Sequence, residues 1–152
     1  MNNSIDFVDF DSNFLALSWK WLNDPEIRIL TSTPEITLEG QLKWFNGLNV
    51  RTDYKVWGMS CDGTKIGVAG LKKITESDAE YFGYIGVKEF WNKGLSSAIF
   101  SFILDYARMT GIGRLWLTVS KENKRAINAY QKAGFKIFNT LDSDLQMELN
   151  EF

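Results

Sequence analysis

The sequence contains no histidine and only one cysteine, Cys61, among its 152 residues. A lone cysteine cannot form an internal disulfide, and without histidine it cannot build a Cys/His dyad or a mixed zinc cluster. Any catalysis must therefore use carboxylates, tyrosine, lysine, serine or water, and we predict no metal site.

An excess of basic residues and long apolar runs are missing as well. The formal net charge is −2 and the isoelectric point is about 5.2, whereas proteins that bind nucleic acids or membrane surfaces cluster Lys and Arg in excess. No stretch approaches the ~20 apolar residues of a membrane helix, and the N-terminus lacks the basic and apolar regions of a signal peptide. We expect a cytoplasmic protein whose partner is a small molecule or another protein, with no nucleic-acid or membrane partner; a homodimer stays open.

Only two prolines interrupt the chain, and no linker or internal repeat divides it. We therefore predict a single domain over residues 1–152. Hydrophobic periodicity predicts an edge strand, two helices, three antiparallel strands, a helix, a strand, a helix and two strands. Their predicted ranges are Ile5–Phe10, Asn13–Leu22, Thr37–Leu48, Tyr54–Cys61, Lys65–Ile74, Ala79–Lys88, Gly94–Met109, Arg114–Ser120, Lys124–Ala133, Phe135–Thr140 and Asp144–Leu149. Asp24-Pro25 is interpreted as the break after the first helix.

The segment FWNKGLSSAIF, residues 90–100, connects a predicted strand to the helix with the most regular apolar spacing. The first N–H groups of a helix have no intrahelical partner and, with the helix dipole, they favour an anion such as a diphosphate. Gly94 lets a ligand approach the backbone, Lys93 adds charge, and Ser96 and Ser97 add hydroxyl groups. The segment therefore predicts a phosphate site.

The alternative for this turn is that Asn92 or Ser96 merely caps the helix. A second pattern, about thirty residues later, favours the phosphate site. Four residues share one helix face because they are spaced 0, 3, 4 and 7: Asn123, Ala126, Ile127 and Tyr130. An N-cap asparagine and a core tyrosine are the alternative interpretation of this face.

The segments WNKGLSSA and NKRAINAYQKAGF resemble motifs A and B of the GNAT superfamily of acetyl-CoA-dependent N-acetyltransferases. The order of the predicted elements is also the order in that family. The resemblance implies an α/β (α+β) fold with a single mixed, mostly antiparallel, twisted sheet of about seven strands flanked by about four helices. Motif A usually reads Arg/Gln-x-x-Gly-x-Gly/Ala, and here Trp91, Gly94 and Ser96 hold these places, so only the central glycine agrees.

The resemblance also implies acetyl-CoA as the cofactor and assigns residues to it. Backbone N–H groups at residues 85–87 would bind the pantetheine arm and the acetyl carbonyl. Tyr130 would be the acid that protonates the leaving thiolate, with a packed core tyrosine as the alternative. The implied cofactor-binding residues are Ile85, Gly86, Val87, Asn92, Lys93, Gly94, Leu95, Ser96, Ser97, Asn123, Ala126 and Tyr130.

Without histidine, the base must be a carboxylate or a water relay. Glu80 is the best placed carboxylate because it lies on the same predicted strand face as Phe82 and Tyr84. It also stands eleven residues before Trp91, where some family members place a catalytic glutamate. Asp78 is a weaker substitute, and a solvated edge charge is the alternative interpretation of Glu80.

The segments SWKWLNDPEIR and EITLEGQLKWF resemble the N-terminal region of the RimJ/RimL-like branch, in particular amino-sugar acetyltransferases of the pseudaminic acid type. That region forms the acceptor wall in the family, and aromatic faces and guanidinium groups suit a sugar or nucleotide phosphate. The implied acceptor-side residues are Trp19, Trp21, Trp44, Tyr84 and Arg28, with helix packing as the alternative for the tryptophans. We expect acetyl transfer to a small amine, first a nucleotide-linked amino sugar. A protein N-terminus or a polyamine as acceptor and a non-catalytic CoA-binding module are the alternatives.

Overall fold

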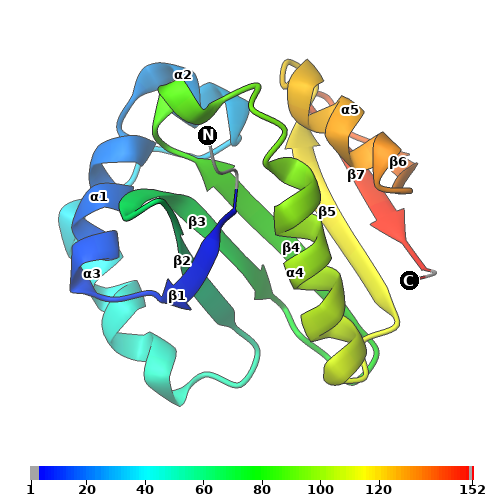
Figure 1. Cartoon of the computed structure of the whole chain (residues 1–152), viewed down its shortest axis with the longest axis horizontal. Coiled ribbons are helices and arrows are strands. Elements are labelled where there is room, and N and C mark those ends of the chain that lie inside the picture. The colour runs from blue at the N-terminus through cyan, green and yellow to red at the C-terminus, as the bar shows by residue number, and fades with distance from the viewer. Residues whose placement is uncertain (1–3, 151) are drawn as a thin grey trace.

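The computed structural model describes residues 4–150 and 152 and folds them around one seven-stranded sheet (Figure 1). Residues 1–3 and 151 of the predicted domain lie outside the described part of the chain. The strands are β1 (Asp6–Asp9), β2 (Lys55–Cys61), β3 (Thr64–Lys72), β4 (Asp78–Ile85), β5 (Arg114–Ser120), β6 (Lys136–Thr140) and β7 (Asp144–Leu149). The helices are α1 (Ser12–Leu22), α2 (Pro25–Leu30), α3 (Leu38–Gly47), α4 (Ser96–Met109) and α5 (Lys124–Lys132), with short 3₁₀ turns η1 (Leu48–Val50) and η2 (Lys88–Phe90).

The described strands follow the order β1-β2-β3-β4-β5-β7-β6. Neighbouring strands are antiparallel except β4 and β5, which run parallel. The predicted mixed, mostly antiparallel sheet with a first strand at its edge is therefore confirmed. Asp62 and Gly63 connect β2 to β3 with φ values of 51° and 82°, which is the backbone geometry of a tight hairpin turn.

Residues 4–150 form five α-helices, where the sequence predicted about four. The additional helix is α2, which begins at Pro25. The Asp24 carboxylate caps it by accepting hydrogen bonds from the N–H groups of Glu26 and Ile27. Proline at the first helical position loses no hydrogen bond, because that N–H has no intrahelical partner in any helix. None of the helices in these residues is long and apolar enough to span a membrane.

Two predicted boundaries shift near the carboxyl end of β4. The strand ends at Ile85 rather than Lys88, and the chain then turns through η2. The next helix begins at Ser96 rather than Gly94, because Asn92 and Gly94 have φ values of 60° and 73°, outside the range of a right-handed helix. A tight turn therefore separates β4 from α4.

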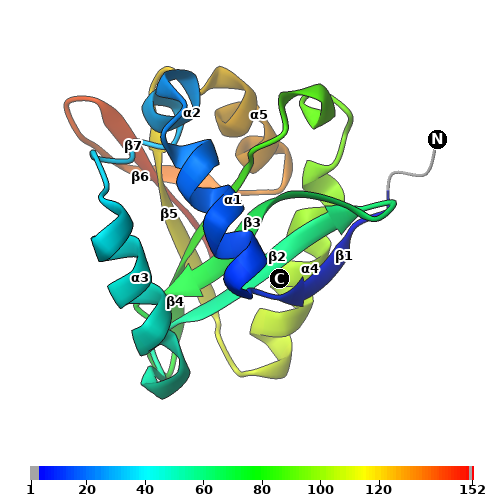
Figure 2. The ribbon, with the colours of Figure 1, turned by 90° about the vertical axis from the view of Figure 1, so that its left-hand side faces the viewer.

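Helices cover both faces of the sheet. On one face, α4 and α5 bury Ile103 and Ile127 in the main core. On the other face, Trp21 of α1 and Ile27 of α2 pack with Val68 of β3. Figure 2 shows α3 and α4 on opposite sides of the sheet.

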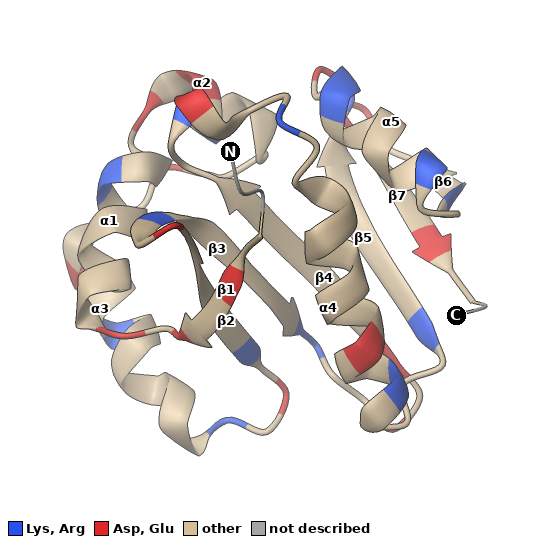
Figure 3. Ribbon diagram, viewed as in Figure 1, with Lys and Arg blue, Asp and Glu red and all other residues tan. Residues whose placement is uncertain are grey.

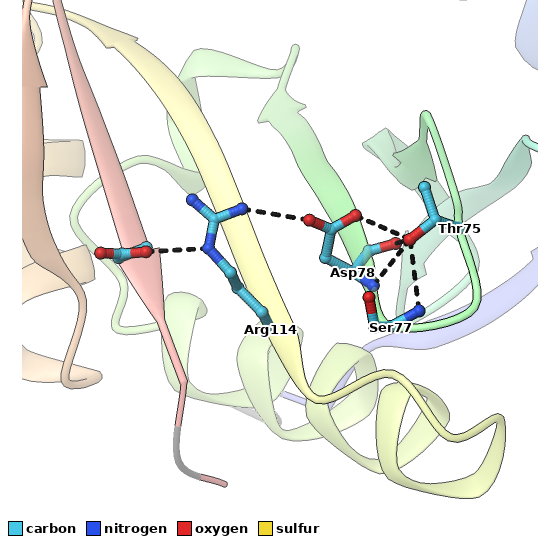
Figure 4. Close-up of polar contacts among 5 residues, drawn as sticks. Thr75, Ser77, Asp78 and Arg114 are labelled. Carbon is cyan, nitrogen blue, oxygen red and sulfur yellow. Dashed lines mark hydrogen bonds and ion pairs between the residues drawn. The ribbon is translucent and has the colours of Figure 1, made fainter.

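Strands β4 and β5 are held together at one end only. Their parallel pairing joins the first three residues of each strand and then stops. At that end, the Arg114 guanidinium lies 3.2 Å from the Asp78 carboxylate and 2.8 Å from the Glu148 carboxylate of β7, and the Thr75 hydroxyl donates to Asp78 at 2.8 Å (Figure 4). Beyond this cluster the two strands separate toward their carboxyl ends (Figure 1). The ion pairs therefore fix the closed end of a gap in the sheet.

Candidate active site

A cavity of about 1140 Å³ lies where β4 and β5 separate. Its wall includes Leu95 and Tyr130, which belong to the α4 and α5 side of the sheet, and Phe82 and Trp44, which belong to the α3 side. The loop at residues 31–37 also lines it. The cavity therefore connects the two faces of the sheet through the gap.

The cavity brings together most, but not all, of the predicted site residues. Those that line it are Trp44, Tyr84, Ile85, Asn92, Lys93, Gly94, Leu95, Ser96, Asn123, Ala126 and Tyr130. The predicted residues that the structure describes outside this wall are Trp19, Trp21, Arg28, Glu80, Gly86, Val87 and Ser97.

The turn before α4 leaves the first N–H groups of that helix without a side-chain cap. The N-cap residue is Leu95, and no side chain caps the helix, so the alternative in which Asn92 or Ser96 caps it is wrong. The Ser97 hydroxyl points back to the Gly94 carbonyl oxygen, 3.4 Å away. Uncapped N–H groups at the start of a 14-residue helix, next to a cavity, favour a bound anion.

Trp91, at the first position of motif A, joins the end of β4 to the start of α5. Its indole Nε1 donates a hydrogen bond to the Ile85 carbonyl oxygen at 2.8 Å. The Arg125 guanidinium lies 4.2 Å from the ring centroid, and the Lys88 ammonium lies 5.8 Å from it. The Lys88 ammonium hydrogen-bonds to the Asp24 carboxylate and thereby lowers the pKa of that carboxyl group.

The backbone after β4 differs from the prediction. The N–H groups of Gly86 and Val87 both donate to the Ile66 carbonyl oxygen, at 2.7 and 3.3 Å, so their predicted contact with the pantetheine arm is wrong. A Cβ at Gly86 would collide with the Trp21 indole, and this glycine therefore makes room for the core. In an antiparallel strand, the backbone N–H and C=O groups of successive residues point toward opposite edges of the strand. Since the Gly86 N–H points to β3, the polar backbone groups of Ile85 point away from β3 and toward the gap.

Asn123 is the N-cap of α5 and also anchors the loop above the cavity. Its Oδ1 accepts a hydrogen bond from the Ala126 N–H at 3.2 Å, and its Nδ2 donates to the Leu30 carbonyl oxygen at 3.1 Å. Both polar ends of the amide are therefore occupied within the protein. Asn123 lines the cavity. Its hydrogen bond to the Ala126 N–H is the N-cap contact that the alternative interpretation predicts.

Tyr130 packs in the core, as the alternative interpretation states, and it also lines the cavity; its role as the acid stays a prediction. Its ring centroid lies 5.4 Å from that of Phe100 and 5.7 Å from that of Phe135. No described group hydrogen-bonds to its hydroxyl. Burial raises the pKa of Tyr130 above its usual value, because a low-dielectric environment disfavours the phenolate. The phenol therefore keeps its proton at neutral pH.

Glu80 is only 6% exposed and lies outside the cavity wall. Its carboxylate is 3.4 Å from the Lys73 ammonium and 3.9 Å from the Lys72 ammonium, which compensates the burial of the charge. The interpretation of Glu80 as a solvated edge charge is wrong, and its role as the base stays a prediction. Asp78, the weaker substitute, is bound to Arg114.

Only one of the three tryptophans predicted for the acceptor side lines the cavity. This is Trp44, whose ring lies edge-on to Tyr54 with 5.9 Å between centroids. Trp21 is 7% exposed and packs in the core, as the helix-packing alternative states. Trp19 and Arg28 also lie outside the wall, so the acceptor contacts of these three residues stay predictions that the cavity does not support.

Tyr84 lines the cavity as predicted, but its hydroxyl oxygen is buried and has no hydrogen-bond partner of good geometry among the described residues. The nearby Ser18 hydroxyl donates its own proton to the Leu15 carbonyl oxygen at 2.9 Å. Burial raises the pKa of Tyr84 well above its usual value, and the Ser18 hydroxyl offsets only part of this rise. A buried hydroxyl without a partner beside a cavity is a group that a ligand can satisfy.

Several residues of the wall were not predicted. Among them are the charged residues Lys72, Arg125, Lys132 and Glu35, which line the described cavity together with the predicted Lys93. Figure 3 shows basic positions at the start of α5 and in the loop before α4, on the two sides of the gap. The Ser/Thr-rich TSTPEIT segment is a sequence signal for the loop at residues 31–37. No local pattern marks Lys72 or Tyr54, because their place in the wall depends on the packing of distant segments.

Comparison with known proteins identifies acetyltransferases that are similar to this chain in sequence and structure. Acetyltransferase PseH of Campylobacter jejuni is 28% identical over 134 residues, which cover 88% of this chain and 83% of that protein. The crystal structure of C. jejuni PseH in complex with acetyl coenzyme A has a TM-score of 0.75 at 22% identity, covering 97% of this chain and 99% of that one. The spermidine N-acetyltransferase of Vibrio cholerae, in complex with CoA and spermine, has a TM-score of 0.87 at 18% identity, covering 97% and 96%. These structural similarities show a shared fold.

The family model described as the acetyltransferase (GNAT) family matches residues 17–135. This range includes the turn before α4, the divergence of β4 and β5, and the whole of α5. Because the match spans well over half of the sequence, the chain belongs to the acetyltransferase (GNAT) family and is an acetyl-CoA-dependent N-acetyltransferase.

Proposed function

We propose that this enzyme transfers an acetyl group from acetyl-CoA to the primary amine of a nucleotide-linked amino sugar, by direct attack in a ternary complex. The observation that carries the proposal is the cavity through the sheet, whose wall is basic. The resemblance of residues 18–28 and 35–45 to amino-sugar acetyltransferases supports the same acceptor. The expected homodimer and cytoplasmic location stay predictions.

The charge of the wall favours an anionic acceptor over a polyamine. Four basic side chains and one acidic side chain, Glu35, line the described cavity. On the α3 side of the cavity, the Lys72 ammonium lies 5.6 Å from the centroid of the Phe82 ring and 3.9 Å from the Glu80 carboxylate, and Tyr54 and Trp44 also line this side. A polyamine carries several positive charges and would need acidic groups there. A nucleotide sugar offers phosphates for an ammonium group and rings for aromatic faces.

The residues on the opposite side fit acetyl-CoA. The uncapped N-terminus of α4, with Lys93 and Gly94 in the preceding turn, suits a diphosphate. When bound, acetyl-CoA supplies the activated acetyl group. Ile85, at the end of β4, and Tyr130, on α5, both line the cavity. The protein therefore contributes position, a proton donor and the exclusion of water.

We propose that a chain of water molecules removes the proton from the amine. Glu80 does not contact the amine and can take part only at the end of this chain that is far from the amine. Glu80 is outside the wall and lies between two lysines, so it does not reach an amine in the cavity directly. Tyr130 then donates the proton to the leaving thiolate, since burial keeps it in the phenol form. The proton removed from the amine leaves through water, and the thiol leaves neutral.

The Glu80→Gln variant tests the relay. We expect its kcat/KM to stay within about threefold of the unchanged enzyme and the pH profile to keep its shape, since loss of a direct base costs about 10²–10⁴-fold. Glu76→Gln is the matched control, because Glu76 is an exposed glutamate in the preceding turn. Disappearance of the acidic limb of the profile in Glu80→Gln alone would make Glu80 the direct base.

A panel of acceptors tests the proposed substrate class. With acetyl-CoA fixed, thiol release is measured for a UDP-linked amino sugar, the free amino sugar, spermidine and a short peptide with a free N-terminus. We expect kcat/KM for the UDP-linked amino sugar to exceed that for spermidine by at least about tenfold, which corresponds to about 1.4 kcal/mol. A preference for spermidine or the peptide would overturn the proposed acceptor, and tight CoA binding without turnover of any amine would indicate a non-catalytic CoA-binding module.

A further inference from the structure

Two cations flank the Trp91 ring, and only one of them has a carboxylate partner among the described residues. Lys88 lies 2.9 Å from the carboxylates of both Asp24 and Glu26. Arg125 stacks on the ring at 4.2 Å and forms no ion pair with any acidic residue that the structure describes. Of the two, Arg125 is therefore the cation whose charge is available to a ligand.

Stacking leaves the hydrogen-bond donors of Arg125 free. A guanidinium is planar, and its five N–H donors lie in that plane, so contact through its face does not consume them. Such a fork binds phosphate oxygens in pairs. The Trp91 ring is itself held by the hydrogen bond from Nε1 to the Ile85 carbonyl oxygen. Arg125 therefore has a fixed support, which lowers the entropy lost when it binds an anion.

Arg125 lines the same cavity as the turn before α4. Arg125, Trp91 and the turn residues Asn92–Ser96 all line it. The turn provides uncapped backbone N–H groups but has Trp91 where motif A usually has arginine or glutamine. We infer that Arg125, stacked on Trp91, provides the guanidinium that binds the diphosphate of the cofactor in this enzyme. Arg125 is the binding residue and Trp91 positions it; the inference does not depend on the proposed acceptor.

Binding of CoA without any acceptor tests the role of Arg125. Isothermal titration calorimetry is performed with the unchanged enzyme and with Arg125→Met, which keeps the length and apolar stem of the side chain. We expect a Kd for CoA about 10- to 100-fold higher in Arg125→Met, as hydrogen bonds to charged groups contribute about 1.5–3 kcal/mol. Arg125→Lys, which keeps the charge but loses the fork, should recover only part of this loss.

Two comparisons separate a diphosphate contact from other causes. Lys124→Met removes one positive charge from the neighbouring position of the same helix, and Lys124 does not line the described cavity, so its Kd should change less than about twofold. Dephospho-CoA lacks the 3′-phosphate but keeps the diphosphate, and Arg125→Met should weaken its binding by the same factor as for CoA. A loss confined to CoA would assign Arg125 to the 3′-phosphate and overturn the inference, as would an unchanged Kd in Arg125→Met.

A double-mutant cycle tests whether Trp91 acts through Arg125. Trp91→Leu removes the aromatic face, and we expect it to weaken CoA binding almost as much as Arg125→Met. The double variant should then bind CoA about as tightly as Arg125→Met alone. Additive losses would show that Trp91 contributes independently of Arg125. Circular dichroism of each variant establishes that it is folded before titration.

Discussion

Replacing Tyr130 with phenylalanine is expected to lower kcat by about 10²–10³-fold, within the range that a positioned general acid contributes. The substitution removes the phenolic proton and keeps the ring, whose contacts with Phe100 and Phe135 hold α5 on the core. The Kd for CoA and the unfolding midpoint should therefore change little. Stopped-flow measurement of thiol release at saturating acetyl-CoA and acceptor tests this result.

The matched control is Tyr81→Phe, because Tyr81 is buried beside Tyr130 with 6.2 Å between ring centroids. This variant should keep kcat within about threefold, since its hydroxyl has no part in the proposed proton transfer. Equal activities of Tyr130→Phe and the unchanged enzyme would remove Tyr130 from the mechanism. An equal loss in both tyrosine variants would indicate an effect on packing instead.

The pH dependence follows from the burial of Tyr130. Burial raises the pKa of Tyr130 above that of a free phenol, which is about 10. The Tyr130 hydroxyl therefore keeps its proton at every pH below this raised pKa. We expect kcat/KM to rise with pH as the acceptor amine loses its proton, and to show no alkaline decline from Tyr130 up to about pH 10. A decline centred between pH 8 and 9 that disappears in Tyr130→Phe would contradict this assignment.

Replacing Trp21 with alanine is expected to lower the free energy of unfolding by about 3–5 kcal/mol, as for other buried large aromatic residues. Trp21 packs with Ile27 and Val68, and its ring lies edge-on to Tyr84 with 6.2 Å between centroids. Gly86 has no side chain where the indole passes. The cavity left by alanine therefore cannot be filled by a neighbouring side chain without moving the backbone at the end of β4. Urea denaturation measures this change through the unfolding midpoint.

Trp44→Ala is the control, because Trp44 is half-buried and lines the cavity. It should destabilise the fold less than Trp21→Ala and raise the KM for the acceptor, since its aromatic face is available to a ligand. If Trp21→Ala instead kept the stability and raised the acceptor KM, Trp21 would belong to the acceptor site and not to the core.

Local patterns in the sequence predicted the elements that carry the cofactor side. The spacing of Asn123, Ala126 and Tyr130 places them on one helix face whatever surrounds the helix, and all three line the cavity. The turn at Gly94 was predicted for the same reason, because a left-handed residue before a regular helix is a local property. Pro25 shows the limit of such patterns: with Asp24 it was interpreted as the break after α1, and in the structure it begins α2.

The acceptor side could not be predicted in this way. Trp19, Trp21 and Trp44 have the same chemistry, and only the packing of α1 and α3 on the sheet decides that Trp44 alone of these three lines the cavity. The lysine neighbours of Glu80 come from the preceding strand and the residue after it, so they depend on the register of β3 and β4. Arg125 acquires its role only because Trp91, from a distant segment, stacks beneath it.

By itself, the sequence determined the order of the strands and of the helices other than α2, the motif-bearing turn and the shared helix face of Asn123, Ala126 and Tyr130, since these depend on residues within one or two turns of each other. The tertiary structure alone decided where chemistry can occur. Pairing between β4 and β5 stops after three residues, and the gap that follows is a relation between strands more than thirty residues apart. The cavity, its basic wall and the exclusion of Glu80 from that wall all follow from this separation, which no local pattern encodes.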